Sequence, residues 1–447
     1  MQTIRNMAVL GGKGMISFVG LRLLLPFTAG IFLSIVSLPA ADTNLTEEVR
    51  LLREQNAGLQ KQLQRQGALL DALTQKVQVL ETSRENAVGG SAVETAPGGF
   101  NLGKVNLSGE GGVAFFNTGR EGFAPNSEFR VDEARLFIEA PIWKSVYFYG
   151  DVDLATHENT DLALYLGELY LDFEDVSQLW GRDGQLNIRA GRMNIPFGEE
   201  YLLRNAIDDP LISHSLSDLW GFDPGVEIYG AAGKFGYVLA VQNGGRSGVQ
   251  DFNGDKSVTG KICFDPDKHW HFSVSGMRTG DLSAQNDFLS AEWFGNGFFQ
   301  SLGSPATTVF HANLVEGDVT ARWASGHVAA FGGYARYGDN DPGVNNGRDI
   351  FYYSIEGVQN LPRKFYAAAR FSEVLAQRGV PVMGFGSGND YFSALTTELW
   401  RLSLGLGYRF SDRLLIKTEY SFEQGREADG GTRNHENFFG TEAAFKF

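Results

Sequence analysis

The sequence predicts an all-β protein, a transmembrane antiparallel β-barrel of about 16 strands (18 is the alternative), preceded by an α-helical coiled coil. Three observations lead to this prediction. Apolar and polar residues alternate in many short segments after residue 103, which is the period of strands with one apolar face. An apolar leader opens the 447-residue chain, and a Phe-rich alternating segment ends it. Glycine (56 residues) and phenylalanine (34) are abundant, which suits many strands joined by Gly-rich turns.

Residues 1–41 have the organisation of a secretory signal peptide. Basic residues precede an apolar run over residues 23–38, and two small residues, Ala40 and Ala41, come before the polar chain. The apolar run is short for a membrane-spanning helix, which needs about 20 residues. We therefore expect this leader to be cleaved after export, with an uncleaved membrane anchor as the alternative.

Residues 42–81 predict a periplasmic coiled coil. Apolar residues recur with a seven-residue period, and only Asn56 and Gln66 are polar at the core positions. A single helix cannot bury such a stripe, so the pattern indicates association between chains. The core positions are Leu45, Val49, Leu52, Asn56, Leu59, Leu63, Gln66, Leu70, Leu73, Val77 and Leu80.

The chain from residue 82 onward divides into a linker and a single β unit. Residues 82–102 are rich in Gly, Ala, Ser and Thr without an apolar period, which predicts a flexible linker. Residues 103–447 predict the barrel, and a further pair of strands within residues 281–304 would raise the strand number to 18. The predicted strands start near Val105, Phe129, Val146, Leu162, Gln185, Gly225, Phe235, Val258, Trp270, Val309, Val328, Ile350, Phe365, Leu399, Leu414 and Phe438.

The apolar face of these strands is predicted to meet lipid. In a soluble sandwich the apolar faces of two sheets pack together, whereas in a membrane barrel they face outward and the polar face lines a wet lumen. The secretory leader favours the barrel. Aromatic pairs toward strand ends, such as Tyr408/Phe410 and Phe438/Phe439, also favour it, because aromatic side chains gather at membrane interfaces. Sixteen to eighteen strands leave an aqueous channel.

Residues 191–200 read Gly-Arg-Met-Asn-Ile-Pro-Phe-Gly-Glu-Glu and resemble the signature of the phosphate-selective porin O and P family of bacterial outer-membrane porins. Residues 129–136 and 170–173 resemble other strands of that family. The resemblance implies a 16-stranded porin, usually trimeric, that carries anions through the outer membrane. The final strand, ending in Phe447, resembles the C-terminal signal of outer-membrane proteins, which implies contact with the barrel assembly machinery.

The signature also predicts a loop that folds into the barrel. Pro196 has no N–H to continue the strand ladder, and Gly198, which follows Phe197, permits a turn. Residues 194–220 then show no clean alternation, and loops of this length are usually functional. Because the resemblance implies a loop in the lumen, we expect this segment to be the constriction loop, with an ordinary external loop as the alternative.

Charged residues in the lumen are expected to set selectivity. Arginine can bind phosphate through two hydrogen bonds, yet Asp and Glu share the same strand faces, so pairing with a neighbouring carboxylate is the commoner expectation for each Arg. The chain carries a net charge of −15; residues 1–100 hold 9 Lys+Arg and 8 Asp+Glu, which leaves −16 for the remainder. The candidate pore-lining or constriction cations are Arg135, Arg189, Arg192, Arg204, Arg322, Arg370, Arg401, Arg409 and Lys417.

We therefore expect an outer-membrane porin through which small hydrophilic solutes, including anions such as phosphate, diffuse passively. Both ends of an even-stranded barrel lie in the periplasm, so the coiled coil would sit below the pore and support a homotrimer or touch peptidoglycan. The alternative is a structural tether in which the coiled coil contacts the cell wall. With 1 Cys, 7 His, an acidic balance and no recognisable hydrolase motif, we expect no enzyme, cofactor, metal or nucleic-acid partner.

Overall fold

The computed structural model describes residues 105–157, 162, 164–245, 250–287, 306–386 and 395–447. The predicted signal peptide, coiled coil and linker all lie outside the described residues. Among the helices that the structure describes, none is long and apolar enough to cross a membrane.

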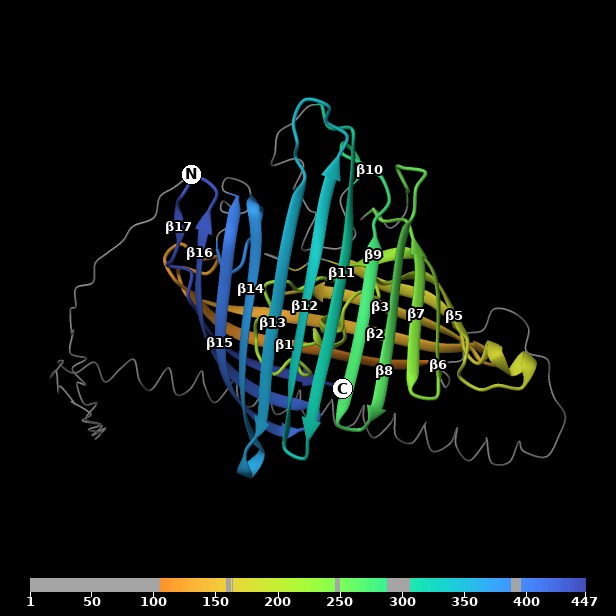
Figure 1. Cartoon of the computed structure of the whole chain (residues 1–447). Helices are drawn as coiled ribbons and strands as arrows, with labels where there is room; N and C mark the ends of the chain where they lie inside the picture. Colours follow the sequence, from red (N-terminus) through yellow and green to blue (C-terminus); the bar gives the residue numbers. More distant parts are fainter. Residues whose placement is uncertain (1–104, 158–161, 163, 246–249, 288–305, 387–394) are drawn as a thin grey trace, which may run out of the picture. The chain divides into compact units, whose positions relative to one another are not determined.

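Sixteen strands of eight or more residues in the described part of the chain form a closed antiparallel barrel (Figure 1). Each pairs with its neighbours in chain order, and the first pairs with the last. The prediction of 16 strands is confirmed, and every predicted start lies within three residues of the observed one. The strands are β1 (Asn106–Thr118), β2 (Glu128–Trp143), β3 (Val146–Ala155), β4 (Tyr165–Phe173), β5 (Asn187–Asn194), β6 (Phe222–Ala232), β7 (Phe235–Gln242), β8 (Ser257–Asp267), β9 (Trp270–Arg278), β11 (Val309–Trp323), β12 (Gly326–Asp339), β13 (Arg348–Asn360), β14 (Phe365–Val380), β15 (Thr396–Ser411), β16 (Leu414–Glu427) and β18 (Phe438–Lys446).

The remaining described elements are short. β10 (Leu282–Ser283) pairs with β11, and β17 (Thr432–Arg433) pairs with β16. Three 3-10 helices are η2 (Val176–Trp180), η3 (Glu200–Leu203) and η4 (Pro362–Lys364).

The connections differ in length at the two ends of the barrel. One end carries mostly tight turns, such as residues 233–234 and 268–269, while the other carries the long segments, including residues 195–221 after β5. β1 begins and β18 ends at the tight-turn end, as expected for an even number of strands.

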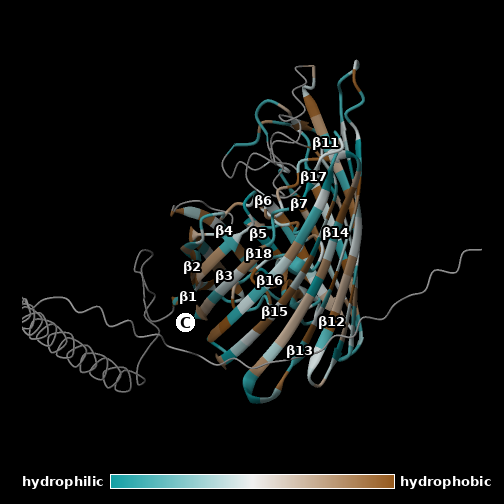
Figure 2. Cartoon of the chain, turned by 90° about the vertical axis from the view of Figure 1, so that its left-hand side faces the viewer, coloured by the Kyte–Doolittle hydropathy of each residue, from teal (hydrophilic) through white to brown (hydrophobic). Residues whose placement is uncertain are grey.

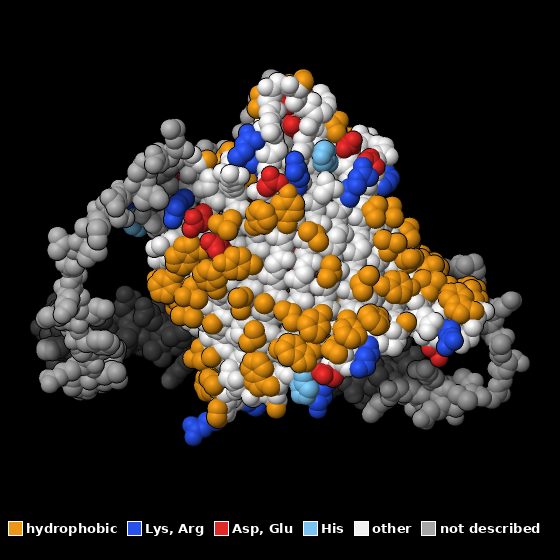
Figure 3. Space-filling view, in the orientation of Figure 1, with side chains coloured by type: hydrophobic (Ala, Val, Ile, Leu, Met, Phe, Trp, Pro, Cys, Tyr) orange, Lys and Arg blue, Asp and Glu red, His pale blue; other side chains and the backbone are white. Residues whose placement is uncertain are grey.

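Along the strands, most apolar side chains point outward and most polar side chains point into the barrel, as predicted. The hydropathy colours alternate along the strands in Figure 2, and the face shown in Figure 3 carries a broad belt of hydrophobic side chains with charged groups nearer its rims. β16 gives the pattern residue by residue. Four of its outward side chains are 39–42% exposed and five of its inward ones at most 2%; the outward four are Leu414, Ile416, Tyr420 and Phe422, and the inward five are Leu415, Lys417, Glu419, Ser421 and Glu423.

The C-terminal strand closes the barrel against β1. The backbone N–H of Phe447 donates to the carbonyl of Gly109 at 2.9 Å, and Phe439 faces outward with 38% of its surface exposed. Phe438, in contrast, is fully buried and stacks on Phe385, with ring centroids 4.7 Å apart. The prediction that Phe438 joins Phe439 at the membrane interface is wrong, because consecutive residues of a strand face opposite sides.

The apolar core lies inside the barrel, where residues 195–221 pack on the wall. Phe197 and Leu216 belong to one cluster with side chains of β9, β11, β12, β13 and β14. Ile207 and Leu211 belong to another, which includes Tyr366 of β14. The fold therefore places this long segment within the lumen, and we call residues 195–221 the inward loop.

Candidate functional site

The inward loop begins with a turn that requires glycine. The Phe197 N–H donates to the carbonyl of Ile195 at 2.8 Å, and Gly198 has a φ of +67°, in the region that side chains disfavour. The Gly198 N–H donates to the Ser275 hydroxyl on β9 at 3.0 Å, and a Cβ at position 198 would collide with the Glu316 carboxylate on β11. Together with Pro196, these features direct the chain from β5 into the barrel.

The loop crosses the lumen to the wall opposite β5. Asp209 forms an ion pair with Arg370 of β14 at 3.0 Å, and Arg370 also bonds Glu356 of β13 at 2.8 Å. The Lys417 ammonium on β16 donates to the carbonyls of Asp209 and Leu211, at 3.1 and 2.5 Å. Since β14 is eight strands from β5 in a 16-strand ring, these contacts span the barrel.

A second group of contacts holds the loop centre. The Ser213 N–H donates to Glu419 of β16 at 2.8 Å, so a wall carboxylate caps the loop backbone. Arg401 of β15 donates to the His214 carbonyl at 3.0 Å and to Glu423 at 2.7 Å. Burial, reinforced by nearby cations, holds the pKa of His214 well below its usual value.

The flank of the loop is fastened to β2. The Ala206 N–H donates to Glu133 at 3.0 Å, and the Arg135 guanidinium donates to the Asn205 side chain at 2.8 Å. On the other side, the Tyr366 hydroxyl donates to the Pro210 carbonyl at 2.9 Å. With bonds to the wall on opposite sides, the loop is a fixed partition of the lumen.

A cavity of about 310 Å³ remains between the loop and the wall formed by β2, β3 and β4. Its lining mixes charged, amide and aromatic side chains. The lining includes Glu133, Arg135, Phe137, Tyr149, Asp153, Glu168, Asn194, Tyr201, Arg204, Asn205, Trp220 and Phe222.

Arg135 is surrounded by carboxylates. Its guanidinium lies 2.9 Å from Asp153 and 3.2 Å from Glu110, and it also bonds Asp151. Three acidic partners exceed the single charge of the arginine, so this part of the wall is locally negative when all are ionised.

Arg189 is paired in the same way on the lumen face of β5. It lies 3.0 Å from Asp172 of β4 and 3.2 Å from Glu227 of β6. Its guanidinium also stacks over the rings of Tyr170 and Tyr229, at 4.4 and 4.9 Å. The Arg189 guanidinium therefore interacts with side chains of the neighbouring strands β4 and β6.

Two further predicted cations belong to the same network. Arg204 pairs with Asp218 within the inward loop and lies over the Trp220 ring at 4.2 Å. Lys417 lies 3.1 Å from Glu442 of β18. With Arg370 and Arg401, these residues fasten the loop.

The structure separates Arg192, Arg322 and Arg409 from this group. Arg192 is in register with the outward-facing Leu169, and its guanidinium donates to the backbone carbonyl of Gly167 at 2.9 Å. Arg322 and Arg409 lie near the ends of β11 and β15, toward the tight-turn end of the lumen.

Acidic side chains outnumber basic ones in the interior of the barrel. Among the buried charged side chains of the described residues, 16 are Asp or Glu and six are Lys or Arg. Adding the partly buried Arg135, Arg189 and Arg204 does not reverse this balance. The negative net charge of the sequence after residue 100 is therefore not confined to external loops.

Comparisons with known proteins identify the fold. No protein-family model matches the chain, and no curated protein matches it. The outer membrane channel DcaP of Acinetobacter baumannii superposes with a TM-score of 0.54 at 13% identity, covering 79% of this chain and 100% of that chain. OmpT of Vibrio cholerae, in its trimer form, gives 0.52 at 12% identity over 77% and 99%. The barrel therefore has the fold of these outer-membrane proteins, while the resemblance to phosphate-selective porins stays a prediction.

Sequence reasoning missed several residues that build the site. Lys261 of β8 donates to the Gly198 carbonyl at 3.0 Å and lies 3.2 Å from Glu199. Its alternation with the outward Ile262 could have identified it as a lumen cation. Arg433, which pairs with Glu436 at 2.5 Å, lies in the two-residue strand β17, which is too short to show an alternation.

Proposed function

We propose that this protein is an outer-membrane porin, a water-filled channel for passive diffusion of small hydrophilic solutes, with the inward loop as its constriction. The observation that carries the proposal is the loop fixed across the interior of a closed barrel whose apolar face points outward. Such a surface is stable only against lipid, and a charged interior is wetted by water. The loop then sets where and how widely solutes pass.

We infer that the channel has weak charge selectivity with a bias toward cations. The resemblance of residues 191–200 to phosphate-selective porins implies anions such as phosphate. However, a phosphate site needs guanidinium groups with donors free for the ligand, and Arg135, Arg189, Arg370 and Arg401 bond wall carboxylates or loop carbonyls. The acidic balance of the interior supports the opposite preference.

We also propose a homotrimer located in the outer membrane, with barrel assembly through the strand that ends at Phe447. The trimer form of OmpT from Vibrio cholerae, which shares the fold, supports this assembly. The peptidoglycan tether depends on residues 45–81, which lie outside the described residues, and no observation favours it over a channel.

Planar-bilayer recording of purified full-length protein tests the function, with heat-denatured protein as the control. We expect discrete current steps, a reversal potential slightly on the cation side in a KCl gradient, and no block by phosphate. Absence of steps would overturn the channel. A strongly anion-selective reversal potential with phosphate block would instead overturn only the inference about selectivity.

A further inference from the structure

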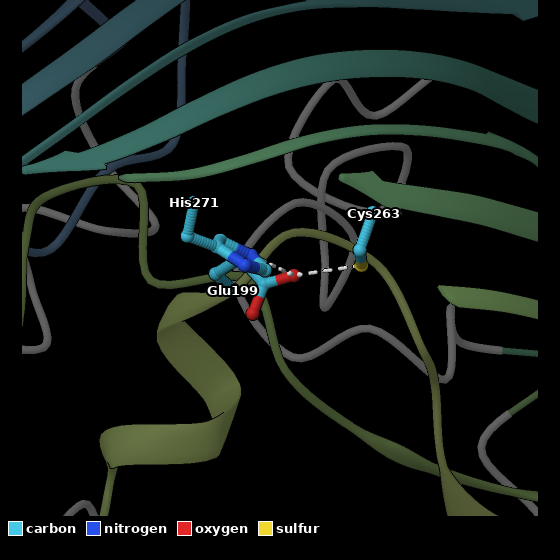
Figure 4. Close-up of side chains that lie close together, drawn as sticks. All are labelled: Glu199, Cys263 and His271. Carbon is cyan, nitrogen blue, oxygen red and sulfur yellow. Dashed lines mark hydrogen bonds and ion pairs between the residues drawn. The ribbon is translucent and has the colours of Figure 1, made fainter. Parts of the chain in front are cut away.

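Three side chains with metal-binding atoms converge beside the first turn of the inward loop. Glu199 belongs to the loop, Cys263 to β8 and His271 to β9. A carboxylate oxygen of Glu199, the sulfur of Cys263 and a ring nitrogen of His271 all lie within 4.8 Å of one another. Figure 4 shows them directed toward one another, with the Glu199 carboxylate contacting both partners. The proposed diffusion function makes no use of this cluster.

The separations match those between ligands of one small metal ion. Glu199 Oε1 lies 3.6 Å from Cys263 Sγ and 3.6 Å from His271 Nε2. With zinc bonds of about 2.0 to 2.3 Å in tetrahedral geometry, neighbouring ligand atoms lie about 3.3 to 3.8 Å apart. Two of the three edges therefore already have the required length, and the third, between Cys263 Sγ and His271 Nε2, is at most 4.8 Å.

His271 is oriented as a metal ligand. Its Nδ1 lies 2.8 Å from the Asp265 carboxylate, which fixes the ring and places the Nδ1 proton toward that oxygen. Metal-binding histidines commonly hold their second nitrogen against a carboxylate in this way. Within the described residues, Nε2 is buried and has no hydrogen-bond partner, although it points toward the Glu199 oxygen. A cation placed between these two atoms would bind a lone pair of each.

The surroundings also permit an ion to enter. The side chains of His271 and Glu199 are 15% and 23% exposed, so the cluster is reachable from the lumen. Lys261 lies 3.2 Å from Glu199 Oε1 and competes for that oxygen. It has an alternative acceptor in the Gly198 carbonyl at 3.0 Å, so it can release the carboxylate without losing all partners.

We propose that Glu199, Cys263 and His271 form a site for a divalent zinc-like ion, with a fourth position open to a lumen water. The set of one thiolate, one imidazole and one carboxylate suits zinc or Co²⁺ better than Mg²⁺ or Ca²⁺, which prefer oxygen ligands. A bound ion would join the start of the inward loop to β8 and β9. The channel constriction would then depend on metal as well as on protein contacts.

Cobalt and zinc binding to the folded, detergent-purified full chain tests this site. After chelation and dialysis, added Co²⁺ should give the near-ultraviolet thiolate-to-cobalt band and the strong visible bands of tetrahedral coordination, and Zn²⁺ should displace them. Cys263→Ser should abolish the thiolate band, and His271→Gln should abolish tight zinc retention. Asp265→Asn should weaken zinc binding about 10- to 100-fold by releasing the histidine ring.

His269→Gln is the matched control, because His269 lies two residues away and bonds the Arg322 carbonyl instead of the cluster. Heat-dependent gel mobility checks that every variant has formed the barrel. A folded wild-type barrel without a thiolate band, or equal zinc binding in wild type and Cys263→Ser, would overturn the proposal. His271 ring resonances that do not change when zinc is added would also overturn it. Failure of metal binding would not abolish the current steps in planar bilayers. It can therefore be distinguished from failure of the proposed channel function.

Discussion

Gly198 is the residue whose replacement should disturb the inward loop most directly. Gly198→Ala forces a side chain into a positive-φ conformation and against the Glu316 carboxylate. We expect a loss of about 1 to 3 kcal/mol in the free energy of unfolding, the range for such strain. Urea unfolding of the barrel in lipid vesicles measures it, and protease cleavage within residues 195–221 should increase.

Gly254→Ala is the matched control, since an added Cβ there meets no atom within 4 Å and its φ is not in the strained region. We expect this variant to unfold like the wild type. Equal stability of the two variants would show that the turn at Gly198 does not have the conformation described.

Arg370 tests the bond between the loop and the far wall. Arg370→Ala removes the partner of two buried carboxylates, Asp209 and Glu356, and breaking such a buried pair costs about 3 to 5 kcal/mol. The exposed pair of Arg336 and Asp349, 3.7 Å apart, provides the comparison, because Arg336→Ala should cost no more than about 1 kcal/mol. Unfolding midpoints in vesicles should separate the two variants, and similar midpoints would contradict a buried attachment.

Single-residue positions could be predicted only where alternation applies. Lys417 and Glu419 face the lumen as expected because their neighbours Ile416 and Phe422 face outward. The same alternation along β5 places Arg192 on the outward face, beside its outward-facing partner Leu169. Partners were harder to predict, since Lys417 bonds a loop carbonyl more than 200 residues earlier in the chain.

At the level of elements, the strands were predictable because each has one apolar and one polar face. In the proposed membrane location, lipid favours apolar residues on the outward face and the wet interior favours polar residues on the inward face, so the two-residue period persists along each strand. The inward loop meets no such regular boundary. Its entry was predictable from Pro196 and Gly198, but its path across the lumen depends on carboxylates and cations supplied by β14, β15 and β16.

The outward face of β15 allows a test of the lipid boundary. Leu404 lies near the middle of the strand and is 47% exposed, whereas Phe410 lies near its end and is 44% exposed. An arginine costs about 2 to 4 kcal/mol at the bilayer midplane and about 0 to 1 near an interface. We therefore expect Leu404→Arg to lower the free energy of unfolding in vesicles far more than Phe410→Arg. Equal effects would argue that this face does not lie in a membrane.

For the whole molecule, barrel closure and strand number could be predicted by counting alternating segments. A barrel needs an even number of strands, and only a few even numbers fit a chain of this length. Solute preference could not be predicted from the sequence, because it depends on the charge that remains in the lumen after the side chains have formed ion pairs. Sequence shows that Arg135 and Asp153 both face the lumen, but only their 2.9 Å separation shows that they form an ion pair.

Single-channel conductance of a loop-shortened variant tests the central claim, that the inward loop constricts a lipid-embedded pore. Residues 199–219 are replaced by a short Gly-Ser linker, and gel mobility verifies that the barrel still forms. We predict discrete current steps for the full chain and larger steps for the shortened one, because the partition of the lumen is gone. Equal steps from both folded proteins, or no current from either, would contradict the account.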